Sequence, residues 1–289
     1  MFPGSAELLT LYRQRSMKIS RRKFLKEISS ASLLLWGGSV LNITAAEAEA
    51  LSKKSTLRFI VASDGHYGQP ETEFDAFQET LIKHTTDFHK GSPLNFCVIN
   101  GDLIHDEKNL LATAKIFLDK LPVKYFVTKG NHDRVSDQYW NEIFGMPVNH
   151  DVVMNNNGLL FATTSNEEGD YLSPDLTWMK SALEKHSKRK NVFIFIHIPQ
   201  AKWTKNAIET PAFFEILKQH RNVRAVFHGH EHDQDNVKMV DNVPYMFDSH
   251  VGGSWGTSYR GFRVVELLKD NSIVTYIMNP TEKLNQATF

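Results

Sequence analysis

Five short apolar runs in this chain of 289 residues each end directly in residues that bind metal ions. Runs of this length that are rich in Val, Ile and Phe and bounded by Gly or Pro predict buried β-strands. The carboxyl ends of strands in an open α/β sheet form its ligand crevice, so we expect the five endings to meet there. In chain order the endings are Asp64-Gly65-His66, Gly101-Asp102, Gly130-Asn131-His132-Asp133, His197 and Gly229-His230-Glu231-His232.

These endings contain the ligands that a dinuclear metal centre needs. Two cations about 3.5–4 Å apart, which activate a water for attack on phosphorus, require a bridging carboxylate and several neutral nitrogen or amide-oxygen ligands. A lone histidine or Gly-Asp pair at a strand end is usually structural, but seven such residues together predict a metal site. We expect Asp102 to bridge, Asp64, His66 and His232 to complete one metal site, and Asn131, His197 and His230 to complete the other.

His132 is left over from this ligand set. A histidine that lies beside a dinuclear site and binds neither ion can stabilise the transferring phosphoryl group or protonate the leaving oxygen. We therefore predict His132 as the catalytic group, and Asp133 as the residue that orients its ring.

The ordered set Asp-x-His, Gly-Asp, Gly-Asn-His-Asp, His and Gly-His-x-His resembles the calcineurin-like metallophosphoesterases over about residues 56–270. The first and last motifs most resemble the bacterial branch of cyclic nucleotide and glycerophosphodiester phosphodiesterases. The resemblance implies the α/β class, with a four-layer α/β/β/α sandwich of two mixed sheets. It also implies a dinuclear Fe, Mn or Zn centre with the ligand roles given above. Gly65 stands where a larger residue is commoner, but no ligand is missing.

The pattern of apolar residues also predicts the elements between these motifs. Helices are expected at residues 71–89, 109–120, 136–144, 175–188 and 211–220, and Ser173-Pro174 marks the start of the fourth. A hairpin is expected at residues 151–164 around a turn at 155–158. Residues 236–278 predict an antiparallel meander. Two facing sheets with helices outside accommodate both halves, and we expect the 19 Phe residues to fill much of the interface.

The first 48 residues predict an export signal. Arg21 and Arg22 stand before Phe24 and Leu25, and a mildly apolar stretch follows, which resembles a twin-arginine signal. Ala46-Glu47-Ala48 and Ala48-Glu49-Ala50 both fit a cleavage site. The alternative, a membrane anchor, requires about 20 apolar residues, and this stretch has about 17. We expect a cleaved signal at residues 1–48, a phosphoesterase domain at 56–280, the twin-arginine translocation machinery as partner, and a periplasmic or extracellular location. Met1 and Met17 both remain open as the start.

Composition limits the other functional classes. The formal net charge is zero, which argues against a general nucleic-acid-binding protein. The sole cysteine, Cys97, lies in a predicted strand and rules out a disulfide within the chain. No stable membrane span is expected, and the oligomeric state stays open.

Substrate recognition is expected to fall to loop residues near the crevice, and the candidates are His105, His250, Trp255 and Tyr259. Trp255 and Tyr259 either stack on a base or sugar or only pack their loop. The first hypothesis is an exported hydrolase of a small phosphodiester of nucleotide or glycerophosphodiester type. The alternatives are a phosphomonoesterase, a nucleotide pyrophosphatase, or a binding protein without turnover.

Overall fold

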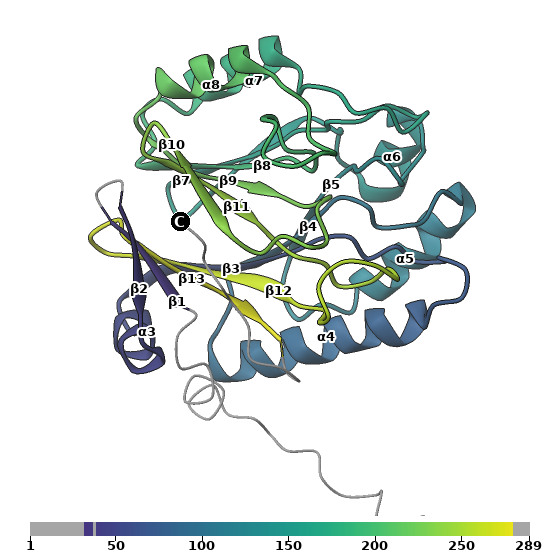
Figure 1. The fold of residues 1–289 in the computed structure, drawn as a ribbon, viewed down its shortest axis with the longest axis horizontal. Coiled ribbons are helices and arrows are strands. Elements are labelled where there is room, and N and C mark those ends of the chain that lie inside the picture. Colours follow the sequence, from purple (N-terminus) through teal and green to yellow (C-terminus); the bar gives the residue numbers. More distant parts are fainter. Residues whose placement is uncertain (1–31, 37–38, 280–289) are drawn as a thin grey trace, which may run out of the picture.

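Two mixed β-sheets lie face to face in the computed structural model, which describes residues 32–36 and 39–279 (Figure 1). The seven-stranded sheet runs in the spatial order β2 (Ser39–Ile43), β1 (Ser32–Trp36), β13 (Ile273–Met278), β12 (Phe262–Leu268), β3 (Ser55–Ala62), β4 (Phe96–Asn100) and β5 (Tyr125–Thr128). The six-stranded sheet runs in the order β10 (Val237–Val240), β11 (Val243–Phe247), β9 (Val223–His228), β8 (Asn191–Phe195), β7 (Asn157–Phe161) and β6 (His150–Met154).

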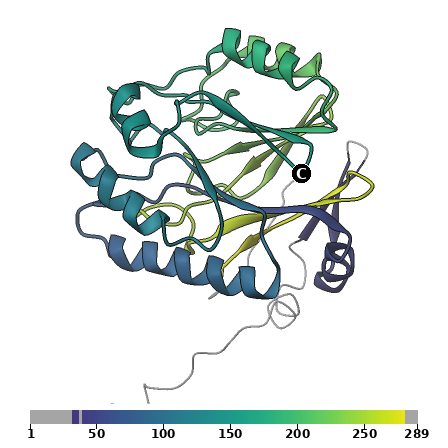
Figure 2. The same cartoon turned by 180° about the vertical axis from the view of Figure 1, so that it is seen from behind.

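Helices cover the outer face of each sheet. Buried side chains of α4 (Phe74–Gly91), α5 (Leu111–Leu118) and α6 (Asp137–Phe144) share one core with the first sheet. Those of α7 (Leu176–Lys185) and α8 (Pro211–Lys218) share another with the second sheet. The view from behind shows the same layering (Figure 2). A short helix α3 (Ala45–Ser52) and a single 3₁₀ turn η1 (Lys108–Leu110) complete the elements of the described residues. The predicted four-layer α/β/β/α architecture is confirmed.

Phenylalanine rings fill the space between the sheets, as predicted. Phe59 of β3 stacks on Phe96 of β4 with ring centroids 4.7 Å apart, and Phe195 of β8 stacks on Phe227 of β9 at 4.9 Å. Phe59 also meets Phe195 edge-to-face across the interface, with centroids 6.0 Å apart. Offset and edge-to-face pairs add to the apolar burial and fix the spacing of the two sheets. The ligand-bearing strand ends are therefore set on a rigid base.

Parallel pairing brings those strand ends to the same edge. Strand β4 lies between β3 and β5 and is parallel to both, and β8 lies between β7 and β9 and is parallel to both. The carboxyl ends of β3, β4 and β5 therefore point one way, and so do those of β8 and β9. The motifs that follow these five strands meet at one rim, where Asp64 accepts a hydrogen bond from the backbone of His230.

The predicted antiparallel meander at residues 236–278 is wrong. Strands β10 and β11 form a hairpin in the second sheet, where β11 pairs in parallel with β9, whereas β12 and β13 belong to the first sheet. The loop between β11 and β12 carries the chain from one sheet to the other, and its Val251 and Gly252 donate backbone hydrogen bonds to Ser63 and Asp64, directly after β3. Apolar periodicity identified the strands correctly but carries no information on their partners.

Two boundaries also differ from the prediction. The hairpin turn is Asn155-Asn156 alone, because both residues adopt positive φ angles, 47° and 63°, and Met154 pairs directly with Asn157. Helix α7 is capped by Asp175 and not by Ser173, because the Asp175 carboxylate accepts the backbone N–H groups of Thr177 and Trp178 at 2.9 and 3.0 Å.

Part of the predicted signal lies within the described residues. Strands β1 and β2 extend the first sheet beyond β13, and Leu33 and Leu35 are buried there. Arg21 and Arg22 lie outside the described residues, so the twin-arginine signal stays a prediction. No described helix is both long and apolar enough to span a bilayer.

Candidate metal centre

Six of the seven predicted ligands fall into two compact groups. The first group is Asp64, His66 and His232, and the second is Asp102, His197 and His230; within each, the potential ligand atoms lie within 4.8 Å of one another. These are the two groups expected from the sequence, with Asp102 placed in the second. All six backbones come from the ends of β3, β4, β8 and β9.

The atoms of the first group converge tightly. The Nε2 atoms of His66 and His232 are 3.0 Å apart, and His232 Nε2 is 3.1 Å from Asp64 Oδ1. Two ring nitrogens and a carboxylate oxygen that point at one another are the donor set of a divalent or trivalent transition metal.

The two carboxylates link the groups. Asp102 Oδ2 lies 3.2 Å from His197 Nε2 in its own group and 3.7 Å from His66 Nε2 in the other. Asp64 Oδ1 lies 3.8 Å from His197 Nε2 as well as 3.1 Å from His232 Nε2. An oxygen of Asp102 within reach of both groups is the arrangement that a bridging ligand requires.

The remaining polar atoms fit bound metal ions. Asn131 Oδ1 and His230 Nε2 are buried, and no protein group hydrogen-bonds to them. Buried polar atoms are normally satisfied, so two such atoms beside two carboxylates call for a ligand. The chemistry of the donors, imidazole nitrogen with amide and carboxylate oxygen, suits Fe, Mn or Zn.

The backbone is strained where it delivers these ligands. Asp64, His66, Asp102 and His230 all have positive φ angles, between 42° and 69°, which non-glycine residues rarely adopt. Such conformations cost of order 1–3 kcal/mol each and persist where the surrounding structure enforces them, as at active sites. Gly101 is required here, because a Cβ atom at this position would lie 2.3 Å from His197 Nδ1.

Three of the ligand histidines are oriented by a contact of the ring nitrogen Nδ1, which does not face the metal site. His197 Nδ1 donates to the carbonyl oxygen of Asn100 at 2.7 Å, and His232 Nδ1 donates to that of Trp255 at 3.1 Å. His66 Nδ1 lies 3.0 Å from His105 Nδ1. The two carbonyl contacts fix the tautomers of His197 and His232, so that their Nε2 atoms point toward the metal site.

Burial and charge act differently on the histidines. Burial lowers the pKa of His66 to about 3 and that of His230 to about 4, which keeps both rings neutral, as metal ligands must be. Burial also opposes the charged form of His197, but the carboxylates of Asp102 and Asp64 outweigh it and raise its pKa to about 10. Metal binding at His197 therefore has to displace a proton.

His132 lies beside His66 of the first group, and the partner of its ring is not the one expected from the sequence. Its Nδ1 donates to Asp106 Oδ1 at 3.0 Å, and its backbone N–H donates to Asp102 Oδ1 at 2.8 Å. The expected partner, Asp133, instead accepts backbone N–H groups of Leu103, Ile104 and Gly130 at 2.8 to 3.1 Å. Asp133 is fully buried and links two ligand loops, whereas Asp106 orients the His132 ring.

Asp106 was missed by the sequence reasoning. Its Oδ1 also forms an ion pair with Arg134 Nε at 3.0 Å, which helps to hold the carboxylate in place. The available signal was a second acid four residues after Asp102 in the same predicted loop.

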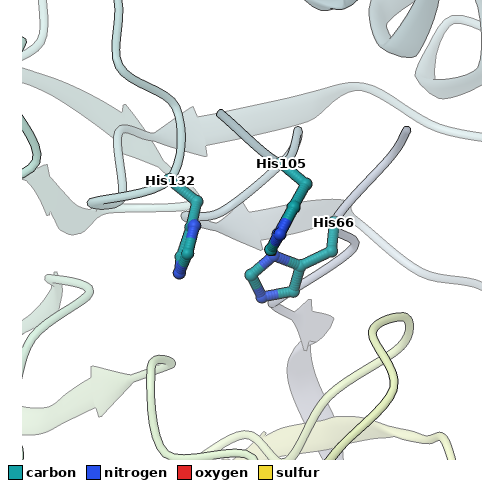
Figure 3. A group of neighbouring side chains, drawn as sticks. All are labelled: His66, His105 and His132. Atoms are coloured by element: carbon teal, nitrogen blue, oxygen red, sulfur yellow. The ribbon is translucent and has the colours of Figure 1, made fainter. Parts of the chain in front are cut away.

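His105 joins His66 and His132 in a third histidine group (Figure 3). The rings of His105 and His132 stack with centroids 4.7 Å apart and planes 12° apart, and His105 meets His66 edge-to-face at 5.1 Å. His105 therefore contacts both a metal ligand and the predicted catalytic histidine.

The other substrate candidates divide into exposed and buried residues. Trp255 is 43% exposed and stacks on His232 with centroids 4.5 Å apart. His250 is buried behind His232, and its Nδ1 lies 2.5 Å from the carbonyl oxygen of Gly252. Tyr259 is buried and donates its hydroxyl to Asp235 at 2.5 Å. Trp255 thus faces the crevice, while His250 and Tyr259 lie within the body of its loop.

Comparison with known proteins agrees with this site. The family model of the calcineurin-like phosphoesterases matches residues 57–234, more than half of the chain, so the chain belongs to this family. Members of this family are typically metal-dependent phosphoester hydrolases with a dinuclear metal centre.

Individual relatives are more distant. The chain is 25% identical over 170 residues to an uncharacterized protein, YvnB, from Bacillus subtilis (strain 168). That match covers 50% of this chain but only 13% of YvnB, so the chain spans a small part of that relative's length. A crystal structure of a dimetal phosphatase from Danio rerio is similar with a TM-score of 0.65 and 15% identity, over 80% of this chain and 98% of that one. At this identity the likeness shows the fold alone.

Proposed function

We propose that this protein is an exported dinuclear metal-dependent hydrolase of a small phosphodiester. The observation that carries the proposal is the joint position of two ligand groups, linked by Asp102, and of His132, whose ring is oriented by Asp106. A binding protein without turnover would need the metal ligands but not an oriented histidine beside them.

Bound metal ions would supply Lewis acids for the phosphoryl oxygens and activate the attacking water. The chain's own residues do the rest. With Nδ1 donating to Asp106, the His132 ring has Nε2 for proton exchange with the leaving oxygen. His105 holds the first group by its contact with His66 Nδ1 and packs the ring of His132 against its own.

The charge around the centre favours a diester. A phosphomonoester carries up to two negative charges and a diester one. The cationic side chain of Arg134 is already paired with Asp106, the partner of His132, so it adds little uncompensated positive charge. The site would thus recognise the phosphoryl group mainly through the metals, which suits a monoanion.

The test is a substrate panel on metal-reconstituted protein. It pairs bis(4-nitrophenyl) phosphate with 4-nitrophenyl phosphate, and a dinucleotide with its mononucleotide. The Danio rerio structure is described as a dimetal phosphatase, and the monoesters in the panel test that activity. A nucleotide pyrophosphate tests the remaining alternative. We expect the higher kcat/KM for the diester of each pair. A higher value for the monoesters or the pyrophosphate would replace the phosphodiesterase proposal with that activity, and no turnover with two ions bound would favour the binding protein.

Export is a separate part of the proposal. The twin-arginine signal is read through two guanidinium groups, which lysine does not reproduce in geometry or donor number. The double substitution Arg21→Lys with Arg22→Lys should therefore retain the protein in the cytoplasm, as measured by cell fractionation. Arrival of the double variant in the periplasm would contradict the twin-arginine route and indicate general secretion.

A further inference from the structure

Two exposed aromatic rings flank the candidate metal centre, one beside each ligand group. Trp255 stacks on His232 of the first group, with planes 8° apart. Tyr171 meets His230 of the second group edge-on, with centroids 4.6 Å apart and planes at 84°. Trp255 is 43% exposed and Tyr171 is 42% exposed. Each of these ligand histidines is thus covered by a ring that still presents surface to solvent.

The loop that carries Tyr171 is braced against the site. Its ends are joined by the hydrogen bond from Leu172 N to the Thr164 carbonyl oxygen at 2.8 Å. Gly169, with φ of +87°, packs so closely on the ligand residue Asn131 that a Cβ atom there would lie 2.7 Å from its carbonyl oxygen. The position of Tyr171 relative to the centre is therefore fixed by the same backbone that delivers a metal ligand.

We propose that Tyr171 and Trp255, the aromatic pair, bind the two organic arms of a phosphodiester in which each arm carries a planar ring. The inference rests on the proposed phosphodiester hydrolysis and specifies its substrate class. A phosphoryl group between the two ligand groups directs one arm past His232 to Trp255 and the other past His230 to Tyr171. A monoester has a single arm and leaves one ring of the pair without a contact.

The position of His132 indicates which arm of the diester lies beside which ring of the aromatic pair. Its ring lies 6.3 Å from that of Trp255 and stacks on His105, which contacts the first group. Since the group that protonates the leaving oxygen must lie beside it, the leaving arm lies on the Trp255 side. The arm that stays on phosphorus then lies on the Tyr171 side.

The test compares bis(4-nitrophenyl) phosphate, which has a ring on both arms, with methyl 4-nitrophenyl phosphate, which has a ring only on the leaving arm. Stacking on an aromatic ring is worth about 5- to 150-fold, so wild-type kcat/KM should favour the two-ring diester by at least about fivefold. Tyr171→Ala should reduce that ratio at least about fivefold, and Tyr171→Phe should restore it. Trp255→Ala should lower kcat/KM for both diesters and keep their ratio.

Leu172→Ala is the matched control, because Leu172 is the next residue and is equally exposed, at 41%. It should keep the ratio, and every variant is checked for two bound metal ions. An unchanged ratio in Tyr171→Ala, or a fall in that variant caused by loss of a metal ion, would overturn the inference.

A binding measurement separates this inference from the proposed function. Calorimetry with diphenyl phosphate, whose leaving group is poorer, reports ring binding to the metal-loaded protein without requiring turnover. Wild-type protein should bind it at least about fivefold more tightly than Tyr171→Ala does. If diphenyl phosphate shows this difference but no diester is hydrolysed, the phosphodiesterase proposal fails and the aromatic pair stands. If diesters are hydrolysed and the difference is absent, the pair fails alone.

Discussion

The two ligand groups are held by different kinds of structure. In the second group, His197 bonds to the carbonyl oxygen of Asn100, the last residue of β4, and the Asn100 side chain is tied to Thr128 at the end of β5 and to buried Asp248. In the first group, His232 bonds to the carbonyl oxygen of Trp255 in the loop between β11 and β12, and His66 rests on the side chain of His105.

His197 of the second group is therefore held by the sheet, whereas His232 and His66 of the first group depend on contacts from two loops. Strand cores open with the global free energy of unfolding, whereas loops open locally at lower cost. We expect the second group to bind its ion more tightly and the first to exchange its ion more readily. The first group also contacts His105, His132 and Trp255. The residues expected to act on the leaving oxygen therefore lie beside the group that depends on loops.

The largest expected effect belongs to the residue that joins the groups. Asp102→Asn keeps the shape of the side chain but removes the charge whose oxygen lies near both His197 and His66. Both metal ions should be lost. Removal of a residue that only orients a metal ligand costs up to about 100-fold in activity, and we expect Asp102→Asn to cost more than that. Elemental analysis measures the stoichiometry, and Asp106→Asn, outside both groups, should keep two ions. Retention of one ion in Asp102→Asn would assign Asp102 to a single group.

Glycine substitutions separate the two kinds of support. Gly101 directly follows β4, and the Cβ atom of Gly101→Ala would lie 2.3 Å from His197 Nδ1. The strand holds this backbone in place, so it cannot move away from the histidine. The variant should lose the ion of the second group and about 1–3 kcal/mol of unfolding free energy. Gly256→Ala has a Cβ atom 2.4 Å from His232 Cβ and 2.7 Å from the His232 carbonyl oxygen, so it should weaken the binding of the first ion. Because a loop opens locally at lower cost than a strand, we expect this variant to lose less stability than Gly101→Ala.

Metal titration and urea unfolding measure both effects. Gly145→Ala is the control for backbone strain alone, because its φ is also positive, +68°, and no atom lies within 4 Å of the added Cβ. It should lose stability without losing metal. Equal stability losses in Gly101→Ala and Gly256→Ala would remove the distinction between a sheet-held and a loop-held group.

The catalytic role on the loop-held side is tested by His132→Ala. Loss of a general acid slows turnover by about 10²–10⁴-fold, and the two metal ions should remain, because His132 belongs to neither ligand group. The deficit should shrink for diesters with good leaving groups, which need no proton. Asp106→Asn should give a smaller deficit with the same dependence on the leaving group, since it acts through the ring of His132. Full activity of His132→Ala on a poorly activated diester would exclude the role.

The sequence predicted what depends on local pattern. Buried strands with candidate ligands at their carboxyl ends follow from apolar runs and from the geometry of parallel sheets, and the structure brings six of these residues into two groups that could hold metal ions. The Asn155-Asn156 turn and the start of α7 differ by a few residues, because side-chain capping and positive φ angles decide such boundaries.

What the sequence could not show depends on contacts between distant segments. The partner of His132 is Asp106 and not its neighbour Asp133, because Asp133 is needed to bond three backbone N–H groups between the loops after β4 and β5. The ring of Tyr171 reaches His230 across 59 positions of sequence through a loop with no motif. The sheet that receives β11 is likewise set by its parallel pairing with β9.

The smallest expected effect tests the side-chain support of the first group. His197 is supported by a backbone carbonyl group, which no substitution removes. His66 is supported by the side chain of His105, which His105→Ala removes. Loss of an outer partner weakens metal binding by about 10- to 100-fold, and the first ion alone should be affected, near the lower end, because His232 and Asp64 remain. His105→Asn, whose amide oxygen takes the place of Nδ1, should restore part of the affinity.

His220→Ala serves as control, because His220 precedes the start of β9, at the opposite end of that strand from the centre. Sequential chelation of the two ions measures each affinity, and weakening of both by His105→Ala would mean that the two groups share one support.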